Sequence, residues 1–166
     1  MFAFYKKHNN HLYNKLVELS RNIFFYRDCG LKDCFETRVI LIFIHLSILV
    51  FIQKKKKAIF DQKTYDNIFQ NIEYGMRELG YGDVTVNKNM KLLNKVFYDI
   101  LIKININKES DFLLNNKVIE KHLSLYSSIN SSILSKIEDY FCSFFNFCLD
   151  LENNVVLMGK INFKYK

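Results

Sequence analysis

The chain has 166 residues, of which 49% are hydrophobic and 16% aromatic, and its formal net charge is +7. This composition excludes a chain that is disordered throughout, because enough apolar surface is present to offset the cost of ordering the backbone. The length is that of one domain, residues 1–166, with a sizeable hydrophobic core. Proline is absent and there are five glycines, so few positions interrupt a helix. We therefore expect an all-α, single-domain bundle of about five to seven helices.

The positive charge is concentrated in local runs, chiefly Lys54–Lys57 and Lys160–Lys166. A basic chain of this kind suits RNA or an anionic membrane surface as a partner. No base-reading motif accompanies the charge, however, and these two runs are not a stripe along one recognition helix. The charge alone therefore does not identify a nucleic-acid-binding protein.

Motifs of enzymes and metal sites are missing from the sequence. There is no phosphate-binding loop, nucleophile elbow or His-Glu-x-x-His pair, so we expect no catalytic residue and no cofactor. The four cysteines are spaced neither as a zinc site nor as a redox Cys-x-x-Cys pair, and we expect free thiols and no metal. These cysteines are Cys29, Cys34, Cys142 and Cys148.

The first predicted helix starts near Asn10 and runs to about Arg27. Its apolar residues repeat by four and three, which is typical of a seam that packs on another helix. Gly30 favours a stop after this helix, and Asp33 is placed to cap the next one. The seam comprises Leu12, Leu16, Leu19, Ile23 and Tyr26.

The second predicted helix contains an uncharged run, Val39–Ile52. Fourteen helical residues span about 21 Å, which is shorter than the roughly 30 Å of a bilayer core. We therefore favour a central buried helix over a membrane span. His45 lies within this run, and a lone histidine on an apolar helix is more often a hydrogen-bonded core residue than a heme or metal ligand.

The middle of the chain predicts a helical hairpin. A third helix has one apolar face, Gly80 is expected to end it, and Gly82 adds a second permissive joint. Asp83 is placed to cap a fourth helix from about Asn87 to Ile106, although Thr85 and Asn87 are alternative caps. Arg77 and Glu78 then stand at one end of the bundle, where they either pair within the turn or form a recognition surface. The third helix's apolar face comprises Tyr65, Ile68, Phe69, Ile72, Met76 and Leu79, and that of the fourth comprises Leu93, Val96, Phe97, Ile100 and Ile104.

The last third predicts one helix through Ile119 and Tyr126, and a second with a strong apolar stripe. Phe144, Phe145 and Phe147 add apolar surface around this stripe, and they form a docking site for an apolar helix if they are not all buried. The segment Val155–Phe163 is expected to pack as a strand or an extended tail. The stripe comprises Leu134, Ile137, Phe141, Phe144, Cys148 and Leu151.

The hairpin and its surroundings resemble the ubiquinol-cytochrome c chaperone family. The family signature stands here as Arg77-Glu78-Leu79-Gly80-Tyr81-Gly82-Asp83, followed by Lys88-Asn89-Met90-Lys91 and Phe97-Tyr98. Upstream matches are Tyr13, Arg21, Phe25-Tyr26, Gly30-Leu31-Lys32-Asp33, Arg38 and His45, and the family's terminal motif resembles Met158–Phe163. The resemblance is close over residues 12–98 and weaker over 108–166. One departure is Asp99, which stands where the family usually has glycine.

The resemblance implies a chaperone, and not an enzyme, that assists assembly of the cytochrome bc1 complex by binding and stabilising newly made cytochrome b. The ribosome, a small partner chaperone and an anionic membrane are further candidate partners. We expect a bacterial protein of the cytoplasm that contacts the inner membrane peripherally, or a protein of the matrix side if the source is eukaryotic. The alternative is a membrane-surface or RNA-binding helical module without a dedicated client.

The candidate client-binding or partner-binding residues are those that match the family motifs. Because Arg21 matches such a position, we favour a buried or semi-buried ion pair, with Asp33 as a candidate partner, over a solvated side chain. The candidates are Arg21, Tyr26, Asp33, Arg38, Arg77, Glu78, Gly80, Gly82, Asp83, Lys88, Lys91 and Tyr98.

Overall fold

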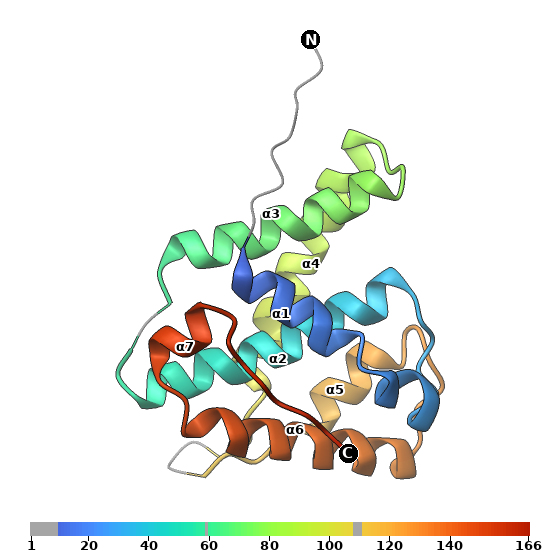
Figure 1. The fold of residues 1–166 in the computed structure, drawn as a ribbon. Helices are drawn as coiled ribbons and strands as arrows, with labels where there is room; N and C mark the ends of the chain where they lie inside the picture. Colours follow the sequence, from blue (N-terminus) through green and yellow to red (C-terminus); the bar gives the residue numbers. More distant parts are fainter. Residues whose placement is uncertain (1–9, 59, 108–110) are drawn as a thin grey trace.

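The computed structural model describes residues 10–58, 60–107 and 111–166, and these residues form a bundle of helices (Figure 1). They contain seven α-helices and one short π-helix, and their only β-type pairing is an isolated bridge between Asn105 and Leu114. The all-α prediction is therefore confirmed. The elements are α1 (His11–Ser20), η1 (Phe24–Asp28), α2 (Phe35–Lys55), α3 (Gln62–Glu78), α4 (Asp83–Lys103), α5 (Asn116–Leu123), α6 (Ser131–Leu149) and α7 (Asn153–Leu157).

Helix α2 is the centre of the bundle. It packs against α1, α4, α5 and α6, and every residue from Val39 to Leu49 is buried. With a mean hydropathy of 2.1, α2 is long and apolar enough to cross a membrane, but 72% of its most apolar window is buried inside the protein. Apolar side chains project from every side of α2, and neighbouring helices cover them. The structure thus agrees with the interpretation of this run as a central buried helix.

His45 is a hydrogen-bonded core residue, as the sequence predicts. Its Nδ1 lies 2.6 Å from the carbonyl oxygen of Leu41, and its Nε2 lies 3.0 Å from the hydroxyl of Tyr140. A carbonyl only accepts, so Nδ1 carries the proton and Nε2 accepts from Tyr140. Burial lowers the pKa of His45 to about 4, partly opposed by the bond to Leu41. The imidazole is therefore neutral at neutral pH.

The first predicted helix is in fact two helices. Helix α1 ends at Ser20, and the side chain of Asn22 then accepts a hydrogen bond from the backbone N–H of Phe24 at 3.0 Å. This local bond competes with continuation of the helix and starts the π-helix η1, whose wide turn places Phe24 and Phe25 together in the core. Ile23 is 61% exposed, so its assignment to the buried seam is wrong. Gly30, at φ +66°, ends this region as predicted.

The α3–α4 hairpin is confirmed, with two corrections. Gly80 has φ +91° and ends α3, and the backbone N–H of Tyr81 donates to the carbonyl of Met76. Gly82 has φ −73°, which any residue adopts, and it occupies the position that caps α4. Asp83 is the first residue of α4 and not its cap, so α4 begins earlier than predicted. Asp33 is also not a cap, because α2 is preceded by Cys34 in that position.

The C-terminal part covers the other side of α2. Phe144 and Phe145 on α6 are buried, and the ring of Phe147 lies 5.5 Å from that of Phe163. Phe147 is 37% exposed, so the three are not all buried, and the docking site stays a prediction that rests on Phe147 alone. After α7 the chain continues as an extended tail that crosses the bundle to α6 (Figure 1). The predicted segment Val155–Phe163 is therefore an extended tail only in its second part, because Val155–Leu157 belong to α7, and the strand alternative is wrong.

The start of this tail lies very close to the start of α1. Gly159 has φ +67°, and a Cβ added there would lie 2.4 Å from the carbonyl oxygen of His11. Only glycine fits both this conformation and this approach. Further along the tail, Ile161 is buried and Phe163 packs edge-on against Tyr140.

Candidate functional site

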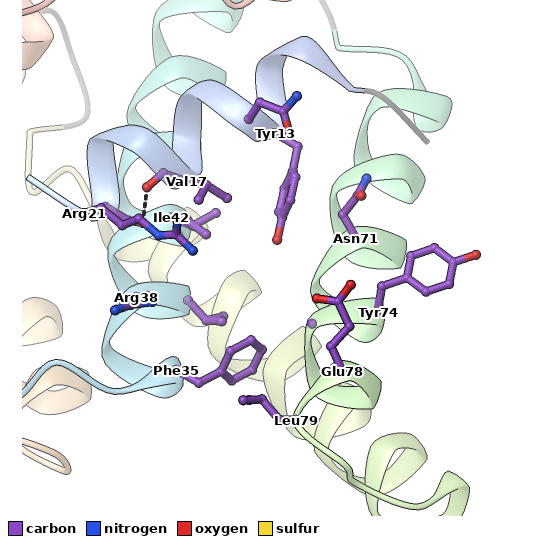
Figure 2. Close-up of a pocket in the computed structure, with 14 residues that line it drawn as sticks. Tyr13, Val17, Arg21, Phe35, Arg38, Ile42, Asn71, Tyr74, Glu78 and Leu79 are labelled. Carbon is purple, nitrogen blue, oxygen red and sulfur yellow. Dashed lines mark hydrogen bonds between the residues drawn. The ribbon is translucent and has the colours of Figure 1, made fainter. Parts of the chain in front are cut away.

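A cleft of about 430 Å³ lies between α1, the first half of α2 and the second half of α3 (Figure 2). It brings together three of the predicted site residues: Arg21, Arg38 and Glu78. Its apolar lining includes the side chains of Val17, Phe35, Val39, Ile42 and Leu79. The cleft is therefore a hollow of mixed character, in which apolar side chains lie beside polar and charged ones.

Opposite charges stand on the two sides of this cleft. Arg21 and Arg38 come from the ends of α1 and α2 that meet there, and Glu78 comes from α3 across the opening (Figure 2). The hydroxyl of Tyr13 extends between α1 and α3 (Figure 2). Burial raises the pKa of Tyr13, while the charge of Arg21 lowers it and that of Glu78 raises it. Both charged groups thus act on the same hydroxyl in the mouth of the cleft.

Arg38 is held in place by Asp33 at the start of α2. Its Nε and a terminal nitrogen both lie 2.7 Å from Asp33 Oδ1. The neighbouring Tyr26 hydroxyl donates to the carbonyl of Ser20 at 2.6 Å. Burial raises the pKa of Tyr26 to about 12, assisted by the charge of Asp33 and opposed by Arg38. Tyr26, Asp33 and Arg38 therefore form one cluster beside the cleft.

The predicted ion pair between Arg21 and Asp33 is consequently wrong. Asp33 lies just before α2, so the nearest arginine is the one on the first turns of that helix, Arg38. Arg21 caps the end of α1 and remains exposed. Its charge faces the cleft instead of being neutralised by Asp33.

Arg77 forms hydrogen bonds within the α3–α4 hairpin. It donates to Glu73 Oε1 at 2.8 Å, one turn back on α3, and also to Asp83 at the start of α4. These bonds raise the pKa of Arg77, that to Asp83 having the largest effect. Arg77 and Asp83 therefore stabilise the turn around Gly80, whereas the adjacent Glu78 lines the cleft. Pairing within the turn is thus confirmed for Arg77, whereas a recognition role for Glu78 stays a prediction.

The other predicted residues lie outside the cleft. Lys88 and Lys91 are exposed on the outer side of α4. Tyr98 lines a separate groove of about 260 Å³ between α3 and α4, together with Tyr65 and Phe69. Neither group contacts the cleft, so the family-like residues do not form a single site.

Sequence reasoning missed a close contact between two residues that line the cleft, Gly75 and Phe35. A Cβ added at Gly75, in the last turn of α3, would lie 3.0 Å from Cε2 of Phe35. An isolated glycine inside a helical pattern suggests such a close approach, but the sequence does not say which side chain makes it. Gly75 thus lets Phe35 pack against α3 at the base of the cleft.

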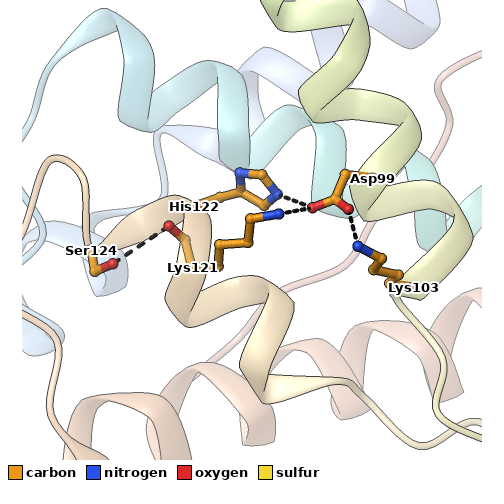
Figure 3. A network of polar contacts seen from close by, with 5 residues as sticks. All are labelled: Asp99, Lys103, Lys121, His122 and Ser124. Atoms are coloured by element: carbon orange, nitrogen blue, oxygen red, sulfur yellow. Dashed lines mark hydrogen bonds and ion pairs between the residues drawn. The ribbon is translucent and has the colours of Figure 1, made fainter.

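Asp99 forms a polar network that joins α4 to α5 (Figure 3). Its carboxylate binds Lys103, Lys121 at 2.8 Å and Nε2 of His122 at 2.7 Å. The hydrogen bonds from Lys103 and Lys121 hold the pKa of Asp99 well below its usual range, and that from His122 adds to them. Because every partner is already engaged with this one carboxylate, the network serves as a clamp between helices. Among the described residues, no group of three or more His, Cys, Asp or Glu side chains is placed to hold a metal ion.

Comparison with known families gives one match, to the family described as ubiquinol-cytochrome C chaperone, over residues 27–121. No curated protein and no solved structure matches the chain. The family match includes Arg38, Glu78 and the whole α3–α4 hairpin, and it begins after α1, so the positions of Tyr13, Arg21 and Tyr26 lie outside it. Since the match covers more than half of the chain, this protein belongs to the ubiquinol-cytochrome c chaperone family, and membership implies a role in assembly of the cytochrome bc1 complex.

Proposed function

We propose that this chain promotes assembly of the cytochrome bc1 complex by binding newly made cytochrome b, and that the cleft between α1, α2 and α3 receives side chains of this client. The observation that carries the proposal is the position of Leu79, which is 59% exposed and lines the cleft together with Val17, Phe35, Val39 and Ile42. Exposed apolar surface beside a hollow is typical of a protein-binding site.

The physical chemistry of the client supports this choice. Segments of cytochrome b expose apolar surface until their hemes and partner subunits cover it. Such surfaces aggregate unless they are shielded. An apolar helix binds by inserting a few side chains from one face into a groove. A cleft of about 430 Å³ is within the usual range for binding pockets, about 300–1,000 Å³. It accommodates a few side chains of one helix and not a whole membrane segment.

The charged rim supplies orientation. Arg21 and Arg38 stand on one side of the cleft and Glu78 on the other. Carbonyl groups at the C-terminal end of a client helix favour cations, and the N–H groups at its N-terminal end favour an anion. A client segment is therefore expected to lie with its C-terminal end toward Arg21, because Asp33 already pairs with Arg38.

The test is the amount of heme-loaded cytochrome b in membranes of cells that lack this protein and are complemented with variants. Arg21→Ala and Leu79→Ser change the cleft without removing any buried side chain, so both should fold. Arg27→Ala is the matched control, because Arg27 is also exposed but pairs with Asp28 on η1, outside the cleft. We expect the two cleft variants to lower cytochrome b severalfold and Arg27→Ala to restore it fully.

Two further readouts give these results a clear meaning. Another heme-bearing respiratory complex in the same membranes should be unchanged, which separates client assembly from heme supply. Co-purification with newly translated cytochrome b, a small partner protein or the ribosome identifies what the chain binds. Full restoration by both cleft variants would show that this cleft is not the client site.

A further inference from the structure

The outward face of α4 is not the polar surface that a bundle helix usually presents. Counting along α4 in steps of four and three gives Val84, Lys88, Lys91, Lys95, Tyr98 and Ile102, which share one stripe. This stripe is opposite the buried side chains of α4, Val86, Phe97 and Ile100. Val84 is 84% exposed and Ile102 is 76% exposed. Leu92, beside the stripe, is exposed as well.

The lysines of this stripe carry uncompensated charge. Lys88, Lys91 and Lys95 form no ion pair with any residue in the described part of the chain, whereas Lys103 and Lys121 nearby are both paired with Asp99. The three lysines line a shallow hollow together with Val84, Asn87 and Leu92. We call the surface formed by Val84, Lys88, Lys91, Leu92, Lys95, Tyr98 and Ile102 the α4 outer face.

We propose that the α4 outer face lies on an anionic lipid bilayer. Helices that rest in a membrane interface combine aliphatic and aromatic side chains, which enter the boundary of the acyl chains, with lysines, which reach the headgroup phosphates. From Val84 to Ile102 the face is about 27 Å long, so it runs along the membrane plane. This inference goes beyond client binding and does not depend on it.

The position of α4 in the fold is compatible with this contact. On its inner side α4 packs against α2, α3 and α5. The cleft is lined by residues of α1, α2 and α3 and by none of α4 (Figure 2). The protein can therefore rest on a membrane through α4 while its cleft stays open.

The apolar residues favour lipid over RNA as the occupant of this face. RNA phosphates would bind the same lysines, but nucleic acid gains little from exposed aliphatic side chains, and single strands are bound mainly by aromatic stacking. The α4 outer face presents three aliphatic residues, Val84, Leu92 and Ile102, and one exposed aromatic ring, Tyr98. Lipid uses both the charge and the aliphatic groups.

The experiment measures binding of the purified full chain to vesicles of phosphatidylcholine alone and of phosphatidylcholine mixed with phosphatidylglycerol. Binding should require the anionic lipid and weaken as salt is added. Each lysine near an anionic surface contributes about fivefold to the affinity. The triple variant K88Q/K91Q/K95Q should therefore bind roughly 100-fold more weakly. The matched control is K54Q/K57Q/K63Q, which removes the same charge from exposed positions on α2, α3 and their connection.

A second variant tests the aliphatic contribution. V84S/L92S/I102S keeps all lysines and removes three exposed apolar groups, so it should fold and bind the anionic vesicles about tenfold more weakly. The chain contains no tryptophan, so Tyr98→Trp introduces a single fluorophore on the α4 outer face. Its emission should shift to shorter wavelength with anionic vesicles. Phe147→Trp on α6 is the control and should not shift.

Three results would overturn the proposal. The first is an equal loss of binding in K54Q/K57Q/K63Q, which would mean that overall charge and not this face binds. The second is unchanged binding by V84S/L92S/I102S. The third is tight binding of a single-stranded RNA oligonucleotide that depends on the three α4 lysines while vesicles are not bound. The vesicle experiments contain no client protein. A negative result would therefore rule out this membrane contact without bearing on the proposed function.

Discussion

Helices α2 and α4 are both 21 residues long, but the bundle uses them in opposite ways. Helix α2 is apolar on all sides and buried from Val39 to Leu49. Helix α4 buries one stripe and leaves other apolar residues, such as Ile102, in solvent. Apolar side chains thus hold the fold together in α2, while in α4 some of them are free for binding. Stability measurements on matched residues of the two helices separate these roles.

The largest expected effect is that of Ile44→Ala in the middle of α2. Ile44 is fully buried, so its truncation loses the transfer free energy of the removed groups and leaves a cavity in a packed core. We expect the free energy of unfolding to fall by about 2–5 kcal/mol. Equilibrium unfolding in urea, followed by circular dichroism, measures it.

The same substitution in α4 is the control. Ile102→Ala removes the same atoms from a side chain that is 76% exposed, and we expect a change within about 0.5 kcal/mol. Similar losses for the two variants would mean that Ile102 is covered in solution, and the contrast between α2 and α4 would not hold.

The next effect is a pH dependence that arises from α2. The folded pKa of His45 is lowered to about 4, below the usual 6.5 of an exposed histidine. Between these values the unfolded chain binds a proton that the folded protein excludes, so stability is lost as the pH falls from about 6.5 to 4. The loss approaches about 3 kcal/mol.

Unfolding curves at several pH values measure this loss. The ring resonances of His45 provide a separate check, because they should remain those of a neutral imidazole until the pH approaches 4. Titration of this ring near pH 6.5 in the folded protein would contradict the assignment of His45 to a dry core.

A smaller effect is expected for Asp99→Asn on the inner side of α4. The asparagine keeps the shape but loses the charge that Lys103, Lys121 and His122 share, and a hydrogen bond to a charged group typically contributes about 1.5–3 kcal/mol. Since Lys103 and Lys121 are largely exposed, we expect a loss of about 1–2 kcal/mol at neutral pH. Asp139→Asn, at an exposed position of α6, should have little effect.

The acid limb of the stability curve tests the same network. The folded pKa of Asp99 is lowered, so its contribution is present above the pKa of the unfolded carboxyl, about 3.9. It is lost as the pH falls below that value. The difference between the wild type and Asp99→Asn should therefore shrink in strong acid. A difference that stays constant would assign the effect to packing and not to charge.

The parts of the fold that the sequence predicts well have local causes. The buried helix α2 follows from a long uncharged run, and the turns at Gly30 and Gly80 follow from residues that adopt positive φ without strain. The α3–α4 hairpin follows from two apolar periodicities joined by such a turn. In each case the signal lies in the same residues that form the structure.

The errors come from choices that are made in three dimensions. Periodicity shows that Ile23 and Leu79 share a face with buried residues, but it does not show that the helix is interrupted at Asn22 or that the bundle ends before Leu79. Likewise, three arginines lie near Asp33 along the chain, and only the packing at the start of α2 selects Arg38. The site is less predictable than the fold for the same reason.

The α4 outer face is also predicted only in part by the sequence. The spacing of Val84, Lys88 and Lys91 is visible in the sequence, but the spacing alone does not tell whether another helix covers them. The structure leaves them exposed. Asp99 is a related case, because its departure from the family's glycine is readable, whereas its clamp to α5 is not.

The smallest expected effect on stability is that of K88Q/K91Q/K95Q, which is also the variant that should affect vesicle binding most. Lys88, Lys91 and Lys95 are spaced by three and four residues, and like charges at such spacing destabilise a helix by about 0.2–0.5 kcal/mol per pair. Two such pairs are removed, so the free energy of unfolding should stay unchanged or rise by at most about 1 kcal/mol. Because salt screens this repulsion, added salt should stabilise the wild type more than the variant. A loss of stability would instead mean that these lysines have partners in the folded protein, and the α4 outer face would then be part of the scaffold, as α2 is.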